Sequence, residues 1–160
     1  MSTLRFLLVL SVSTWIGSLI FFPIVAQTAF TELPSSHLAG LVVRGSLIKL
    51  HWIGIACGLI FLGCSLAHNR VVLGRGRVFA ASHVLVVLML VLTAISQFLI
   101  IPRMDAIRAS AGEISLIATN NPLRLQFDSL HAWSVRIEEI LLVLGLIVLY
   151  SVARRITSRA

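Results

Sequence analysis

Three long stretches without charge limit what this chain can fold into. They cover residues 6–31, 50–69 and 78–102, and they contain 26, 20 and 25 residues without Asp, Glu, Lys or Arg. An α-helix of about 20 residues crosses the roughly 30 Å hydrocarbon layer of a membrane. A soluble domain has about 25% charged residues, whereas this chain has 12%, together with 58% hydrophobic residues. These features predict an integral membrane protein.

A fourth apolar run is too short to cross a membrane by itself. Ile140–Ala153 has 14 residues, so a crossing there must include the charged residues that precede it. We therefore predict an all-α fold, an integral membrane four-helix bundle that is antiparallel, with a short interfacial helix between spans 1 and 2. Residues 1–160 are expected to form a single membrane domain. The expected spans are residues 5–30, 46–67, 77–101 and 131–153, and residues 102–130 are expected to form an extramembrane loop.

The distribution of positive charge predicts the orientation. With four spans, one side of the membrane has seven cations and no acid, whereas the other has six cations and all six acids. The dense clusters at Arg70–Arg77 and Arg154–Arg159 favour the cytoplasm for the first side. We therefore expect a multi-pass protein of a bacterial inner membrane with cytoplasmic N- and C-termini. Because the cations lie at helix ends rather than on one exposed face, the net charge of +7 does not predict nucleic-acid binding.

Polar side chains at the start of the fourth span form one narrow stripe. With about 100° between successive residues of a helix, His131, Ser134 and Glu138 share a face. Topology brings further side chains to this outer level, and the predicted polar layer comprises His51, Arg103, His131, Ser134, Glu138 and Glu139. Such a layer can bind an anion, a metal or a proton, and Arg103 is the expected ionic partner of Glu138 or Glu139.

The alternative interpretation of this layer is an interfacial collar whose long side chains reach back to water. Counting back about 20 residues from Arg154 places the outer boundary near Ser134. Glu138 then lies roughly 6 Å inside that boundary, at 1.5 Å per residue. This shallow depth favours the collar over a dedicated site.

The inner side has a second group of candidate ligands. Cys64 and His68 lie four residues apart on one helix face, and His83 begins the third span, so these side chains could bind copper or zinc. Haem b is a further alternative, held between His51 and His131 or between His68 and His83. Lone histidines in membrane helices more often hydrogen-bond a neighbouring helix. We therefore predict no cofactor and leave the metal unknown.

Two glycines on the second span indicate close packing. Gly54 and Gly58 form a small-xxx-small pair, which lets a neighbouring helix approach. Because such pairs are common in membrane helices, packing within one chain is favoured over a dedicated dimer interface. A homo-oligomer and a complex with another membrane protein both remain open, and the lipid bilayer is the expected partner.

Three segments resemble one family of membrane proteins. Residues 127–138, Phe-Asp-Ser-Leu-His-Ala-Trp-Ser-Val-Arg-Ile-Glu, are similar to the F-x-x-L-H-x-x-S entry to the last helix of transmembrane protein 205-like domains. Residues 15–22 are similar to the first helix of that family, and residues 101–108 to the segment after its third helix. In the family, a polar amide often lies four residues after the serine, at the position where this chain has Glu138. The resemblance implies four membrane helices and no established catalysis.

The same resemblance bears on function. The eukaryotic member of the family is associated with platinum-drug resistance, and the wider fold is distantly similar to copper-resistance membrane proteins. We expect a non-enzymatic role in transport, metal handling or membrane organisation, exercised through the outer polar layer. The alternative is a haem-binding redox membrane protein that uses the histidine pairs.

Overall fold

A computed structural model describes residues 2–73 and 81–157, and every regular element in these residues is a helix. The all-helical fold class is therefore confirmed. Three of the cations that predict the orientation, Arg75, Arg77 and Arg159, lie outside the described residues. The elements are α1 (Ser2–Glu32), α2 (Ser36–Leu73), α3 (Ala81–Ile95), a π-helix (Ser96–Ile100), α4 (Ile101–Ala111), a 3-10 turn (Ile114–Leu116) and α5 (Pro122–Thr157).

Three helical segments of the described chain are long and apolar enough to cross a membrane. They are Thr3–Glu32, Ser36–His68 and Ala81–Ala111, the last of which joins α3, the π-helix and α4. Their agreement with the three uncharged runs supports a membrane protein. The helix α5 has 36 residues, and its first half contains charged side chains.

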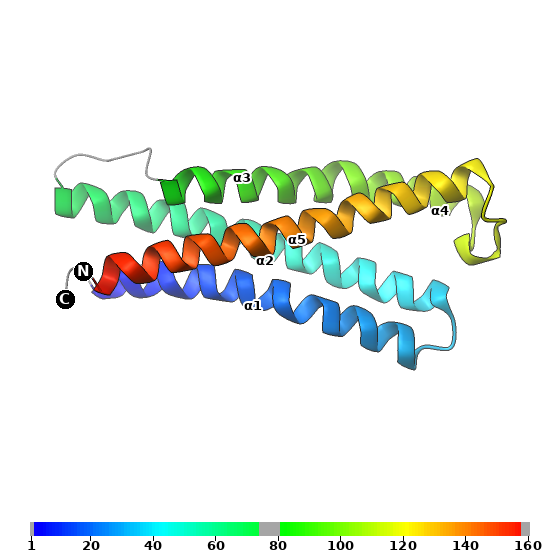
Figure 1. Ribbon diagram of the computed structural model, residues 1–160, viewed down its shortest axis with the longest axis horizontal. Coiled ribbons are helices and arrows are strands. Elements are labelled where there is room, and N and C mark those ends of the chain that lie inside the picture. Colours follow the sequence, from blue (N-terminus) through cyan, green and yellow to red (C-terminus); the bar gives the residue numbers. More distant parts are fainter. Residues whose placement is uncertain (1, 74–80, 158–160) are drawn as a thin grey trace.

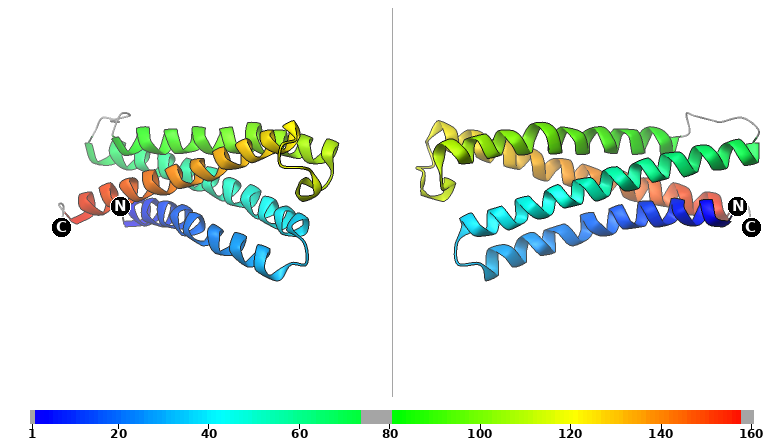
Figure 2. Two further views of the ribbon diagram at one scale, coloured as in Figure 1. Left: turned by 45° about the vertical axis from the view of Figure 1, so that its right-hand side comes forward. Right: turned by 180° about the vertical axis from the view of Figure 1, so that it is seen from behind.

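The long helices lie side by side (Figure 1). α1 packs along α2, α3 packs along α5, and further contacts join α1 to α5 and α2 to α3. The first residues of α1 and the last residues of α5 lie at the same end of the molecule. Toward the other end, α1 and the first half of α2 diverge from α4 and the first half of α5, as both views in Figure 2 show.

The predicted separate interfacial helix is wrong, because Ser36–Leu73 is one continuous helix. No proline interrupts residues 36–46, and neither glycine in this segment has a positive φ. The helix has a capped start, since the Leu38 N–H donates to Ser35 Oγ at 3.2 Å. Within the expected loop 102–130, residues 102–111 and 122–130 are helical, which leaves a shorter connection at 112–121.

The chain remains helical through Pro102, which closely follows a π-helix. Proline cannot donate a backbone hydrogen bond, and its ring clashes with the carbonyl of the preceding turn. The wider turn of Ser96–Ile100 comes directly before this position. The third long helix therefore continues to Ala111, where Gly112 ends it with a φ of 71°. This continuation places α4 beside α5.

Candidate ligand cleft

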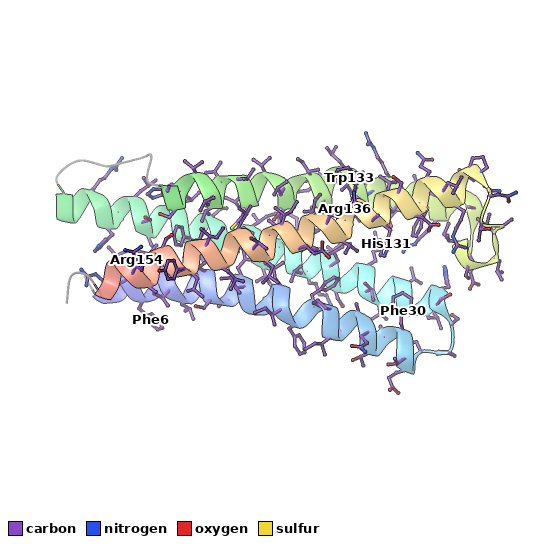
Figure 3. The ribbon with its side chains drawn as sticks, in the orientation of Figure 1. Phe6, Phe30, His131, Trp133, Arg136 and Arg154 are labelled. Carbon is purple, nitrogen blue, oxygen red and sulfur yellow. The ribbon has the colours of Figure 1, made fainter. Side chains whose placement is uncertain are left out.

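A cleft of about 640 Å³ opens where the two helix pairs diverge. This volume lies within the range of small-molecule sites, about 300–1,000 Å³. Most of the wall is apolar and comes from α1, α2, α4 and α5; its members include Leu19, Phe22, Pro23, Ala26, Phe30, Val43, Leu47, Ile101, Met104, Phe127, Val135 and Leu142. Figure 3 labels His131 and Phe30, which line the cleft from α5 and α1. An apolar wall with a few polar groups is typical of a ligand site.

A charged group lies at the wide end of the cleft. Arg44 of α2 donates from Nε and Nη2 to the two carboxylate oxygens of Asp105 on α4, with both distances 2.5 Å. Arg108 lies one turn further along α4, with Nη1 3.7 Å from Asp105 Oδ1. Its guanidinium lies 4.9 Å from the centre of the Phe127 ring on α5. We call Arg44, Asp105 and Arg108 the rim cluster. Through the contact with Phe127, this cluster links α2, α4 and α5.

A second polar group lies deeper and centres on His51 of α2, whose side chain is 1% exposed. Nδ1 of His51 lies 2.9 Å from Oε1 of Gln97, and Nε2 lies 2.8 Å from Oε1 of Glu138. Gln97 comes from the π-helix and Glu138 from α5. His51, Gln97 and Glu138, here called the His51 cluster, thus join the three segments at one buried point.

The hydrogen-bond pattern defines where protons lie in the His51 cluster. The amide oxygen of Gln97 accepts, so Nδ1 of His51 carries a hydrogen. The contact between Nε2 and the Glu138 carboxyl then contains one proton, either as imidazolium with carboxylate or as imidazole with carboxylic acid. The pair has no net charge in either form. Oε2 of Glu138 is buried and has no hydrogen-bond partner among the described residues.

The two clusters lie at different depths along the same helices. Seven residues of α2 separate Arg44 from His51, which corresponds to about 10 Å of helix. Eight residues separate Gln97 from Asp105, or about 12 Å. Arg44, Asp105, Arg108 and Glu138 all line the cleft. A ligand in the cleft would therefore meet charge at the rim and the Glu138 side chain deeper inside.

The structure brings together four residues of the predicted polar layer on α5. His131, Ser134, Glu138 and Glu139 all line the cleft, and His51 is reached through Glu138. The His131 ring stacks on Phe127, with centroids 6.5 Å apart and planes 5° apart. Trp133 and Arg136, also labelled in Figure 3, do not line the cleft; Arg136 lies over the Trp133 ring.

The predicted pairing of Arg103 with Glu138 or Glu139 is wrong. Glu138 contacts His51, and Arg103 is exposed and does not line the cleft. The buried residues of α4 are Ile101, Met104 and Ile107, so Arg103 lies on another face of the helix. Sequence reasoning also missed the rim cluster. In the sequence, Arg44, Asp105 and Arg108 served only to predict the membrane orientation. The signal for an ion pair was the acid and base three residues apart on α4.

The inner ligand candidates do not form a metal site in the described residues. Cys64 and His68 are half-buried and His83 is buried, but no group of three or more His, Cys, Asp or Glu residues is placed there to hold a metal ion. For the outer haem pair, both ring nitrogens of His51 already have side-chain partners. The imidazole of His51 therefore offers no nitrogen to a haem iron in this arrangement.

The rim cluster should contribute measurably to stability. We expect Asp105→Asn to lower the free energy of unfolding by about 2 kcal/mol, because the carboxylate accepts two charge-assisted hydrogen bonds and separates two guanidinium groups. Asp128→Asn is the matched control, since Asp128 forms a more exposed pair with Arg124 four residues away. Its loss should be about 0.3–0.5 kcal/mol. Denaturant titration in detergent measures both values, and equal losses would contradict the assignment.

A comparison with protein-family models places most of the described helices in one family. The model described as "Domain of unknown function (DUF4149)" matches residues 10–113, which include the rim cluster, His51 and Gln97 but not Glu138. No curated protein and no solved structure gave a match. The resemblance to transmembrane protein 205-like domains stays a prediction. The chain belongs to the DUF4149 family, a group of uncharacterised domains with, in this member, apparent membrane-spanning helices.

Proposed function

We propose that this protein binds a small amphipathic molecule inside the membrane and holds or transfers it without chemical change. The observation that carries the proposal is the cleft, which combines a long apolar wall with polar groups at two depths. An amphipathic molecule can bury its apolar part against α1 and α2 while its polar part meets the rim cluster. Neither end of such a ligand is then left in an unfavourable environment.

The proposal includes the membrane arrangement. We infer an antiparallel four-helix bundle of a bacterial inner membrane, in which α5 is the fourth span and both ends of the chain are cytoplasmic. Its support is that the start of α1 and the end of α5 lie together, at the end of the molecule opposite the divergence (Figure 1). The cleft then opens at the outer side, where the predicted polar layer belongs.

Binding is favoured over catalysis by the state of the charged side chains in the two clusters. Asp105 is held by Arg44, and Glu138 is held by His51. His51 is almost completely buried and lies behind Glu138, so its imidazole is not placed to touch a ligand. A general base must come within hydrogen-bond reach of the proton it abstracts. Metal handling, by contrast, would need ligands beyond those that the described residues bring together.

A pair of alanine variants tests whether the cleft is occupied. Ala26→Phe should reduce the amount of bound compound several-fold, because a phenyl ring at this lining position narrows the cleft. Ala56→Phe is the control, since Ala56 is exposed and does not line the cleft. Both proteins are purified in a mild detergent, and co-purified compounds are measured by mass spectrometry. Identical compound profiles in both variants and the unmodified protein would contradict the proposal.

A further inference from the structure

We propose that the occupant of the cleft is an anionic phospholipid whose phosphate binds Arg108. This inference rests on the proposed function and specifies its ligand class. It is carried by an imbalance of charge in the rim cluster, by the geometry of the Arg108 guanidinium, and by the apolar wall beside it.

The charge of Arg108 is not neutralised within the rim cluster. Arg44 binds both oxygens of Asp105, whereas Nη1 of Arg108 lies 3.7 Å from Oδ1, beyond hydrogen-bond distance. One carboxylate therefore serves two guanidinium groups, and the cluster has a net charge of +1. Arg108 lines the cleft with its side chain 20% exposed. Within the described residues, no acceptor is hydrogen-bonded to its guanidinium.

Two other acids at this end of the cleft form contacts of their own and no ion pair with Arg108. Asp128 accepts from Arg124 at 3.2 Å, and Glu113 accepts from Ser115 Oγ at 2.7 Å. Arg124 also donates to the Ile114 carbonyl at 2.7 Å, which holds it against the 112–121 connection. Among the described arginines that line the cleft, Arg108 is therefore the one whose guanidinium has no hydrogen-bonded acceptor.

The guanidinium is held in a way that suits a phosphate. It lies over the Phe127 ring at 4.9 Å from the centroid, an arrangement that attracts a cation and restricts its plane. The N–H groups of arginine lie in that plane and match the spacing of phosphate oxygens. A carboxylate or phosphate can thus accept two hydrogen bonds from one guanidinium.

The position of Arg108 favours a lipid over a free anion. Arg108 lies three residues before the end of α4 at Ala111, about 4.5 Å along the helix. In the proposed membrane arrangement, this level is the end of the third span, where lipid headgroups would meet the protein. Phe22 and Phe30 of α1 line the same cleft and provide an apolar surface for an acyl chain. A free phosphate would leave this surface unused.

The test measures the thermal unfolding midpoint of the full chain in a neutral detergent while phosphatidylglycerol is titrated. We expect phosphatidylglycerol to raise the midpoint more than phosphatidylcholine, and Arg108→Gln to weaken the apparent affinity for phosphatidylglycerol about tenfold. Arg108→Lys should give an intermediate loss, because it keeps the charge but not the planar donors. Arg103→Gln is the matched control, since Arg103 is an exposed cation on the same helix outside the cleft.

Several outcomes would overturn the inference. Equal losses in Arg108→Gln and Arg103→Gln would show non-specific attraction, and equal shifts with the two lipids would remove the anionic preference. A shift by inorganic phosphate as large as that by phosphatidylglycerol would show an anion site without a lipid chain. If Arg108→Gln does not fold, an unchanged affinity of Arg108→Lys for phosphatidylglycerol would overturn the inference. Loss of bound compound in Ala26→Phe with normal lipid affinity in Arg108→Gln would refute the lipid assignment and leave the cleft proposal intact.

Discussion

Replacing His51 with leucine should lower the free energy of unfolding by about 3 kcal/mol, because the buried Glu138 carboxyl loses its hydrogen-bond partner. The Glu138 side chain is 13% exposed, and its Oε1 atom has His51 as its partner. Its Oε2 atom already lacks a hydrogen-bond partner in the described structure. In the leucine variant the whole carboxyl would be unpaired, so the protein would bury a polar group without a hydrogen-bond partner.

Two further variants separate this explanation from simple loss of packing. Glu138→Gln should cost less than about 1.5 kcal/mol, because a glutamine amide can donate to Nε2 of a neutral His51. The double variant His51→Leu, Glu138→Leu should recover most of the loss, since it removes both polar partners. Denaturant unfolding in detergent measures all three proteins. A Glu138→Gln loss as large as that of His51→Leu would contradict a role for the buried carboxylate.

His131→Leu is the control for the histidine itself. His131 is exposed on α5, where it stacks on Phe127. Among the described residues it has no ionic partner. Its replacement should change the free energy of unfolding by less than about 0.5 kcal/mol, as for most surface substitutions. The two histidines were equivalent members of the polar layer predicted from the sequence. Their different burial is what separates the expected effects.

The fold could be predicted from the sequence wherever composition alone decides. Uninterrupted apolar runs have one stable form in a membrane, the helix, because every backbone polar group must find a partner within the segment. The three runs therefore correspond to three long helices. The continuity of α2 through residues 36–46 was missed because hydropathy marks where a helix can be buried, not where it begins. A helix can extend beyond the apolar run if nothing breaks it.

The partners within the candidate site were less predictable. Helical periodicity placed His131, Ser134 and Glu138 on one face of α5, and all three line the cleft. Periodicity does not give the rotation of one helix relative to another. Arg103 and Asp105 are two residues apart on α4, yet Asp105 contacts Arg44 whereas Arg103 is exposed. Two residues correspond to a rotation of about 200°, so the two side chains lie on nearly opposite faces of α4 and only one of them can face the other helices.

The glycine pair on α2 provides the second large effect, since Gly54 lies against a fully enclosed aromatic ring. A Cβ at position 54 would lie 2.5 Å from Nε1 and 2.7 Å from Cε2 of Trp15. Trp15 on α1 is 2% exposed, so the ring has no free space into which to move. We expect Gly54→Ala to lower the free energy of unfolding by about 3 kcal/mol, at the upper end of the cost of overpacking. The reason is steric conflict between α1 and α2.

Gly63 provides the matched control on the same helix. A Cβ at position 63 meets nothing within 4 Å, so Gly63→Ala should be neutral or stabilise the protein by up to about 1 kcal/mol, because alanine is the better helix former. Trp15→Leu removes the atoms that conflict with position 54, and the Gly54→Ala loss should shrink in that background. Equal effects at Gly54 and Gly63 would mean that the Trp15 ring does not lie against α2.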